Sequence, residues 1–381
     1  MTRTKKNILV FSDWFLPGFK AGGPIRSLAN LVNVLQHQFY IVTSNRDHHT
    51  EMPYPGIAYN SWVKFADNVQ VMYLEDSRIT ADTFQEIMLS QDFDKIYFNS
   101  LFSPRFTLTP LRTAKRLGLI SKCILAPRGM LKPGALSVKP LKKKVFLMMA
   151  KLTGLYRGIT WHATSEDEKE SILKHFPDAG EIRMAPNLSD VPKEKTVKPA
   201  KNTGELKLVC IARISPEKGI LEAIQSLKAM NVNGEVSCDF YGIQQNAGYL
   251  ETCRSLAESI SNIRIHFRGE IVPADIPIKL KQYHFLFMPT LGENFGHAIA
   301  EALNHATPVI ISNLTPWRGL EEKQAGWDIP LQPDSFARIL EKCLAMPNNE
   351  YQLLCEGAYL HGRSVALDMG GIEASYLVFE P

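Results

Sequence analysis

Two glutamates bracket a glycine in the stretch Gly292–Leu303, and they are the first candidates for chemistry. Glu293 falls in a predicted turn after an apolar strand, and Glu301 lies about two helical turns further on. In α/β folds, ligands bind where a strand leads into a helix N-terminus. Backbone N–H groups at Phe295 and Gly296 could bind negative charge, whereas the two carboxylates suit sugar hydroxyls better than phosphate. The alternative is an amphipathic helix with two solvated glutamates.

Two cations follow a second predicted strand. Arg213 and Lys218 flank a loop at the carboxyl end of residues 206–212, where a diphosphate could lie between them. A further phosphate could bind the paired glycines Gly22 and Gly23, which precede a helix predicted to begin near Pro24. An ordinary tight turn between strand and helix explains the two glycines equally well.

Two more residues are candidates for an acceptor side. Arg128 stands at the carboxyl end of the strand predicted at 123–126, a position that faces the ligand crevice in open α/β sheets. A salt bridge is the alternative role for Arg128. His162 lies inside the strand predicted at 159–163, where a core histidine with satisfied hydrogen bonds is the alternative to a functional group.

Three consecutive lysines open a predicted helix. Lys142, Lys143 and Lys144 lie in its first turn, where cations oppose the helix dipole. The same helix carries one apolar stripe, made of Leu141, Val145, Met148, Met149 and Leu152. An anionic membrane surface would give the lysines a function, and a solvated basic helix end is the alternative.

These candidates must be positioned by parallel sheets, because short apolar runs alternate with amphipathic helices along the whole chain. Strands are predicted at residues 8–11, 39–43, 69–73, 95–98, 123–126, 159–163 and 182–185 in the first half, and at 206–212, 236–241, 263–267, 285–288 and 309–312 in the second. The 381 residues exceed the usual size of one core. We expect doubly wound domains at 1–192 and 193–365, joined by a hinge at 190–205, and a terminal helix near 373–379.

Composition narrows the class of protein. A net charge of +4 suits anionic ligands or a membrane surface and does not call for nucleic acid. The six cysteines are scattered, which is typical of reduced core residues in a cytosolic protein. We expect neither a signal peptide nor a membrane-spanning segment. We also expect no metal site, since no Asp-x-Asp-like cluster ends a strand.

Three motifs together resemble one known family. Gly22-Gly23, the run from Arg213 to Gly219, and Glu293–Leu303 followed by Thr307–Ile310 resemble the retaining glycosyltransferases of the GT-B fold, the large family 4 of sugar transferases. The resemblance covers nearly the whole chain in the right order. It implies two Rossmann-like domains facing a central cleft, no metal or cofactor, and a last helix, about 366–381, that packs back on the first domain.

The resemblance also implies a role for each donor-side residue. Arg213 and Lys218 would bind the donor diphosphate, Glu301 the ribose hydroxyls, and Glu293 the hydroxyls of the transferred sugar. The N–H groups of Asn294, Phe295 and Gly296 would complete this pocket.

The first domain would contribute Gly22 and Gly23, which would approach the diphosphate from the facing side. Two departures from the family pattern stand out. Many members carry a histidine where this chain has Arg128. Ala306 stands where a glycine is common, which costs ~1 kcal/mol if the backbone there is left-handed.

The function that the resemblance implies is transfer of a hexosyl or related sugar from a nucleotide-diphosphate sugar to a glycan or lipid-linked acceptor, with retention. The expected setting is assembly of a cell-envelope polysaccharide such as lipopolysaccharide, at the cytoplasmic face of the membrane. The alternatives are a nucleotide-sugar epimerase or hydrolase on the same fold, and a non-catalytic nucleotide- or glycan-binding protein. An NAD-dependent oxidoreductase is disfavoured, because no Gly-x-Gly-x-x-Gly follows Phe11.

Overall fold

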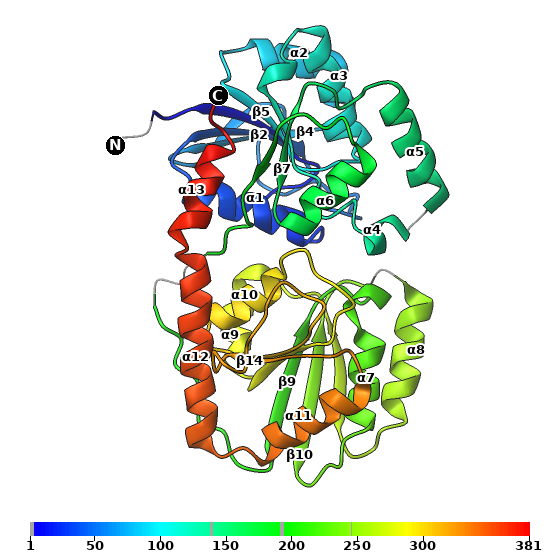
Figure 1. The fold of residues 1–381 in the computed structure, drawn as a ribbon, viewed down its shortest axis with the longest axis vertical. Helices are drawn as coiled ribbons and strands as arrows, with labels where there is room; N and C mark the ends of the chain where they lie inside the picture. The colour runs from blue at the N-terminus through cyan, green and yellow to red at the C-terminus, as the bar shows by residue number, and fades with distance from the viewer. Residues whose placement is uncertain (1–3, 138–139, 191–193, 245) are drawn as a thin grey trace. The chain divides into compact units, whose positions relative to one another are not determined.

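The computed structural model describes residues 4–137, 140–190, 194–244 and 246–381. It separates into two compact units, Met1–Leu188 with Asp368–Pro381, and Ser189–Leu367. Each unit is a sheet between layers of helices (Figure 1). The boundary expected at residue 192 lies outside the described residues.

The first unit is built on an eight-stranded sheet in the order β3-β4-β2-β1-β5-β6-β7-β8. Its strands are β1 (Asn7–Phe11), β2 (Gln38–Ser44), β3 (Trp62–Ala66), β4 (Val69–Leu74), β5 (Lys95–Phe98), β6 (Cys123–Leu125), β7 (Thr160–Ala163) and β8 (Ile182–Met184). β3 runs antiparallel to β4 at the edge, and the other pairs are parallel. The sequence predicted every strand except β3, a largely exposed edge strand whose apolar residues are interrupted by Lys64.

Both faces of this sheet are buried, as its continuous apolar strands require. Along β1, Ile8 and Val10 face one core with α1, while Leu9 and Phe11 face a second core with α2 and α3. The helices of this unit are α1 (Gly23–Val34), α2 (Ala81–Leu89), α3 (Thr109–Arg116), α4 (Pro133–Ser137), α5 (Pro140–Leu152), α6 (Glu166–His175) and α13 (Met369–Leu377). Short helical turns lie at Asp76–Arg78, Pro104–Leu108 and Ile120–Lys122.

The terminal helix α13 belongs to the first unit. Lys6 donates from Nζ to the Phe379 carbonyl at 2.9 Å and pairs with Glu380 at 2.8 Å. Arg183 on β8 donates to the Leu377 carbonyl at 3.0 Å. Cations therefore cap the carboxyl end of α13, where the helix dipole is negative.

The second unit has a six-stranded parallel sheet in the order β11-β10-β9-β12-β13-β14. Its strands are β9 (Glu205–Ile211), β10 (Glu235–Tyr241), β11 (Arg264–Gly269), β12 (Phe285–Met288), β13 (Val309–Ser312) and β14 (Gly326–Ile329). Its helices are α7 (Ile220–Lys228), α8 (Ala247–Glu258), α9 (Ile276–Leu280), α10 (His297–Asn304), α11 (Pro333–Ala345) and α12 (Asn348–Ala366). Short helical turns lie at Pro216–Lys218 and Pro273–Asp275. The strand order reverses between β9 and β12. The sequence did not predict β14, a short strand that begins with glycine and contains an aspartate.

Two lysines of the segment predicted as a hinge, 190–205, are anchored in the second unit. Lys198 is buried, and its Nζ donates to the carbonyls of Leu280 and Tyr283, the latter at 2.6 Å. Lys201 is buried as well, and its Nζ donates to the Met346 carbonyl at 3.0 Å. The carbonyls lie at the ends of α9 and α11, where helices leave acceptors unpaired. These lysines are therefore helix caps.

Candidate functional site

The two donor-side motifs meet in the second unit because their strands are neighbours. Arg213 and Lys218 follow β9, and the stretch from Glu293 to Gly296 follows β12, which pairs with β9 in parallel. The strand order of this sheet reverses between these two strands. In open α/β sheets, ligands bind outside the carboxyl ends of the strands at such a reversal.

Lys218 and Glu293 form an ion pair at this edge. Lys218 Nζ lies 2.6 Å from Glu293 Oε1, and the two side chains are only 16% and 11% exposed. Partly buried charges at this separation are weakly screened by salt. A sugar bound through a diphosphate presents anionic oxygens beside hydroxyls, so an adjacent ammonium and carboxylate can bind both.

Arg213 is paired with a residue that the sequence analysis did not identify. Its Nη2 lies 3.2 Å from Oε1 of Glu217, four residues further along the chain. The backbone carbonyl of Glu217 accepts hydrogen bonds from the Leu291 N–H and the Thr290 hydroxyl, both at 3.0 Å. The loop after β9 is therefore tied to the loop after β12, which holds Lys218 beside Glu293.

The close approach of these loops requires glycine at position 219. Gly219 has a φ of 66°, and a Cβ there would lie 1.8 Å from the Pro289 carbonyl oxygen. No side chain fits in that space. Gly219 therefore allows the loop to approach Pro289, and this close approach sets the position from which the Lys218 side chain extends.

Helix α10 begins at a second left-handed glycine. Gly296 has a φ of 84° and immediately precedes α10. The carbonyl of the residue before it, Phe295, accepts a 2.5 Å hydrogen bond from Trp317 Nε1. Ile299, Ala302 and Leu303 are buried, which confirms the predicted core face of this helix, and Glu301 is half-buried. Beyond the helix, Ala306 has a φ of 54°, so the alanine does occupy a left-handed position that favours glycine.

The first unit has its own polar network where its strand order reverses, between β1 and β5. Gly22 has a φ of 68° and caps α1, whose first residue is Gly23. Asn99, which follows β5, donates a hydrogen bond to the Pro24 carbonyl at 3.0 Å. Asp13, after β1, accepts a 2.6 Å hydrogen bond from Ser103 Oγ. Burial raises the pKa of the Asp13 carboxyl above its ordinary value. This unit thus offers polar groups at the position where α/β sheets bind ligands.

Arg128 joins this network from the end of β6. Its Nε donates to Asn99 Oδ1 at 2.8 Å, its Nη1 to Asn187 Oδ1 at 2.6 Å, and its Nη2 to the Tyr97 hydroxyl at 2.8 Å. Its φ is 54°, and the next N–H, at Gly129, donates to the buried carboxylate of Glu168. The three acceptors of the Arg128 guanidinium, on Asn99, Asn187 and Tyr97, are neutral side-chain oxygens. The observed role of Arg128 therefore differs from the salt bridge that was the alternative from the sequence.

His162 lies in the core of the first unit. Its Nε2 lies 3.0 Å from the Ala185 carbonyl and its Nδ1 lies 2.7 Å from the Tyr97 hydroxyl. Because a carbonyl only accepts, Nε2 carries the proton and Nδ1 accepts from the tyrosine. Burial and the nearby Arg128 charge lower the pKa of His162 to about 3. The geometry favours the core interpretation over an acceptor-side role.

The second unit also resembles a known family by sequence. Residues 192–358 match the family model "Glycosyl transferases group 1", a range that includes Arg213, Lys218, Glu293 and Glu301. The matched range covers most of the second unit. No curated protein matches the chain.

Solved structures resemble the chain over its full length. Sucrose-phosphate synthase from Thermosynechococcus elongatus superposes with a TM-score of 0.67 at 16% identity, over 99% of this chain and 100% of that one. HepE from Anabaena, in complex with UDP and glucose, gives 0.66 at 14% identity over 98% of both chains. WaaG, a glycosyltransferase involved in lipopolysaccharide biosynthesis, gives 0.65 at 12% identity over 98% of this chain and 99% of that one. The chain has the GT-B fold that the resemblance implied.

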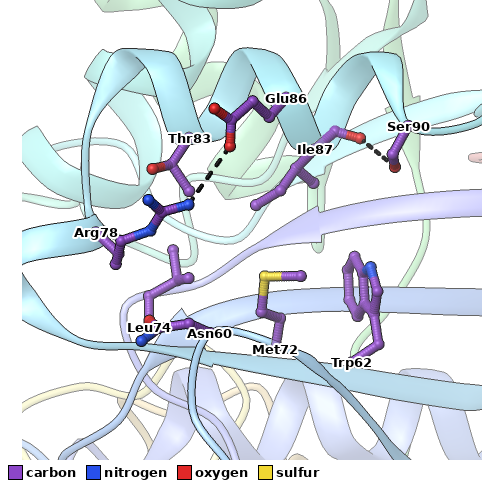
Figure 2. Close-up of a pocket in the computed structure, with 9 residues that line it drawn as sticks. All are labelled: Asn60, Trp62, Met72, Leu74, Arg78, Thr83, Glu86, Ile87 and Ser90. Carbon is purple, nitrogen blue, oxygen red and sulfur yellow. Dashed lines mark hydrogen bonds and ion pairs between the residues drawn. The ribbon is translucent and has the colours of Figure 1, made fainter.

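The first unit also contains a small cavity, away from the strand reversal. It has a volume of about 200 Å³ and lies between α2 and strands β3 and β4. Figure 2 shows Trp62 and Met72 facing Ile87, with the Arg78–Glu86 pair at one end. Its lining includes no residue of the matched range 192–358, and its volume falls below the ~300–1,000 Å³ of most ligand sites.

The described residues contain neither a metal cluster nor a membrane-spanning helix. Among the residues that the structure describes, no three His, Cys, Asp or Glu side chains are grouped as a metal ion would require. In the described part of the chain, no helix combines the length and apolarity needed to cross a bilayer.

Asp13, Asn99 and Glu217 are polar residues at strand ends that the sequence analysis did not select. Each follows a predicted apolar strand directly or within a few residues, which is the signal that could have identified them. That signal is shared by many loop residues. Only the strand order shows that Asp13 and Asn99 follow adjacent strands.

Proposed function

We propose that this protein transfers a hexosyl or related sugar from a nucleotide-diphosphate sugar to a glycan or lipid-linked acceptor, with retention of anomeric configuration. The observation that carries the proposal is the Lys218–Glu293 pair at the strand reversal of the second unit, within the range that matches group 1 glycosyl transferases. The expected setting is assembly of a cell-envelope polysaccharide, including lipopolysaccharide.

The chemistry follows from the charges at this edge. Lys218 and Arg213 bind the donor diphosphate and neutralise the charge that develops as the bond from the anomeric carbon to phosphate oxygen breaks. Glu293 binds hydroxyls of the transferred sugar. The acceptor oxygen bonds to the anomeric carbon from the face that the phosphate leaves, and the acceptor proton passes to the departing phosphate oxygen. No separate protein base is then needed.

The rest of the donor pocket comes from the same helix start. Glu301 binds the ribose hydroxyls, and backbone N–H groups of Asn294, Phe295 and Gly296 bind the sugar and phosphate oxygens. The left-handed backbone at Gly296 supports this role because it lets the loop after β12 turn into α10 at this residue. Gly22 and Gly23 form a further phosphate contact from the first unit.

The first unit binds the acceptor in this proposal. Its polar network of Asp13, Asn99 and Arg128 lies at the strand reversal, where hydroxyl-rich ligands find hydrogen-bond partners. Of the three lysines expected to meet a membrane, Lys142 and Lys144 contact it in this proposal, whereas Lys143 donates to the Ala135 carbonyl instead. The protein would then work at the cytoplasmic face, where lipid-linked acceptors would be accessible.

We further propose that transfer requires neither metal nor cofactor, because Arg213 and Lys218 supply the positive charge. Activity should survive a metal chelator at full rate. A requirement for magnesium or manganese would contradict this assignment of the cations.

A screen of nucleotide diphosphates and their sugars by thermal shift tests the donor site. A ligand held at 100 times its Kd stabilises the protein by about 2.7 kcal/mol, which is easily measured. Positive ligands are then assayed for sugar transfer with and without acceptor. Turnover without acceptor would favour the epimerase or hydrolase, and binding without turnover in any acceptor mixture would favour the non-catalytic protein. If no nucleotide shifts the melting temperature, the donor site is wrong.

A further inference from the structure

Helix α5 turns its apolar stripe to solvent. A helix on the surface of a globular protein normally buries this stripe against the core. Figure 1 shows α5 at the margin of the first unit. Along one side of it lie five large exposed side chains: Leu141 (79% exposed), Val145 (55%), Met148 (54%), Met149 (49%) and Leu152 (76%).

The opposite side of α5 fixes this orientation. Phe146, Leu147 and Ala150 pack on the core of the first unit, and the Phe146 ring lies edge-on to Phe102 at 5.3 Å. Lys143 is also on this side, where its Nζ donates to the Ala135 carbonyl at 2.6 Å. The helix therefore cannot bury the stripe by rotating unless it gives up these contacts.

Lysines flank the stripe on both sides. At 3.6 residues per turn, the five apolar residues cover roughly 100° of the helix circumference. Lys142 lies at one border, Lys144 and Lys151 lie at the other, and all three are exposed. The run from Pro140 to Leu152 contains no Asp or Glu. Lysine stems can lie along an apolar surface while their ammonium groups reach outward.

We infer that α5 lies in the plane of an anionic bilayer and inserts the stripe of Leu141, Val145, Met148, Met149 and Leu152 among the acyl chains. Lys142, Lys144 and Lys151 then lie at the level of the phosphate headgroups. A second copy of the chain is a poorer match, because a two-fold contact through this face would bring lysines together. Lysine is also depleted from the cores of protein interfaces. The inference deepens the membrane contact proposed above and adds insertion to it.

Flotation with vesicles tests insertion. The double variant Leu141→Gln/Leu152→Gln should lower the partition coefficient on phosphatidylglycerol-containing vesicles on the order of ten-fold or more. The matched control is Leu353→Gln/Leu360→Gln, which changes two leucines on α12 that are each 56% exposed. The control should partition as wild type does. Equal partitioning of the stripe variant and wild type would overturn the inference.

Fluorescence gives a second measurement that does not depend on a loss of binding. Tryptophan in the variant Val145→Trp should be quenched by lipids brominated on the acyl chains, beyond any quenching of the wild-type tryptophans. Absence of additional quenching in vesicle-bound protein would contradict insertion. Self-association of wild type that the stripe variant abolishes, measured by sedimentation without lipid, would assign the stripe to a second copy instead.

Failure of insertion and failure of the proposed transfer reaction are distinguishable. Partitioning requires no turnover, and the nucleotide thermal shift requires no membrane. A stripe variant that has the melting temperature of wild type without ligand is folded, so its loss of partitioning reports on α5 alone.

Discussion

At the scale of single residues, the donor site brings opposite charges together. Lys218 and Glu293 lie on loops after different strands and form a partly buried pair at 2.6 Å. The pair holds both side chains in position before any ligand binds, so less side-chain entropy is lost on binding. An anionic ligand must, however, compete with the Glu293 carboxylate for the Lys218 ammonium. Replacing Glu293 and replacing Glu301 should therefore have different effects on nucleotide binding and turnover.

Glu301→Ala should weaken binding of both a nucleoside diphosphate and its sugar conjugate, because both contain the ribose. Glu293→Ala should leave the free nucleoside diphosphate bound at least as well as wild type, since Lys218 loses its competitor. Its turnover should fall by the equivalent of roughly 1.5 to 3 kcal/mol, the value of a charge-assisted hydrogen bond. Calorimetry with the nucleotide and steady-state rates with the full donor give the comparison. The reverse pattern would mean that the donor is assigned the wrong polarity in the site.

His162 should make the protein sensitive to acid. Its pKa is lowered to about 3 in the folded state, against about 6.5 in an unfolded chain. Between these values the unfolded chain holds a proton that the folded protein lacks, so the free energy of unfolding falls as pH falls. From about pH 7 to about pH 5 this loss is about 2 kcal/mol for one histidine.

Urea unfolding at these two pH values, for wild type and His162→Gln, measures the effect. The variant should be less stable at both values, because the hydrogen bonds to Tyr97 and Ala185 are disturbed. Its dependence on pH should nevertheless be smaller than that of wild type. An unchanged pH dependence would contradict a neutral, buried His162.

At the scale of elements, the turn from β9 into α7 positions the cations. The short helical turn Pro216–Lys218 ends at Gly219, whose backbone touches the loop after β12. Two constraints act on this glycine, its left-handed backbone and the absence of space for a side chain. Gly204 has only the first constraint, because its φ is 82° and nothing lies within 4 Å of a Cβ placed there.

Gly204→Ala should therefore cost about 1–2 kcal/mol of stability, the strain of a left-handed alanine. Gly219→Ala should cost about 2–4 kcal/mol, because a clash with the Pro289 carbonyl is added to that strain. It should also reduce nucleotide binding, since Lys218 is displaced. Chemical unfolding and calorimetry on both variants separate the two effects. Equal losses of stability in the two variants would show that the loop after β12 shifts to accommodate the Cβ at position 219 with little loss of stability.

At the scale of the whole molecule, each unit places polar groups where its strand order reverses, and one helix of the first unit carries the basic and apolar surface. The three lysines of that surface are not equivalent. Lys142 and Lys144 are exposed, whereas Lys143 donates to the Ala135 carbonyl and lies 5.5 Å above the Phe102 ring.

Lys142→Gln and Lys144→Gln should each weaken binding to anionic vesicles by on the order of 1 kcal/mol at low salt. Lys143→Gln should have a smaller effect on vesicles, because its ammonium is turned toward the protein. All three variants should bind nucleotide as wild type does. Vesicle titrations at two salt concentrations provide the measurement. Equal binding by wild type and the Lys142→Gln/Lys144→Gln variant would mean that this helix end is merely solvated.

The sequence by itself determined the local elements and the residue types of the site. Apolar runs bounded by polar residues and glycines located the strands of both sheets apart from β3 and β14, because a buried parallel strand needs continuous apolar residues. Strand-end positions likewise singled out Lys218 and Glu293. These features depend on neighbours in the chain, which sequence patterns report.

Only the tertiary structure decided what those elements contact. The pairing of β9 with β12 joins Lys218 to Glu293, and no local pattern encodes which strands are neighbours. The burial of Lys198 was also invisible in the sequence, because its partners are helix ends about eighty residues away. The stripe of α5 was visible, but a periodic pattern shows only that one side differs from the other. Packing of Phe146 against Phe102 decided that the stripe faces outward.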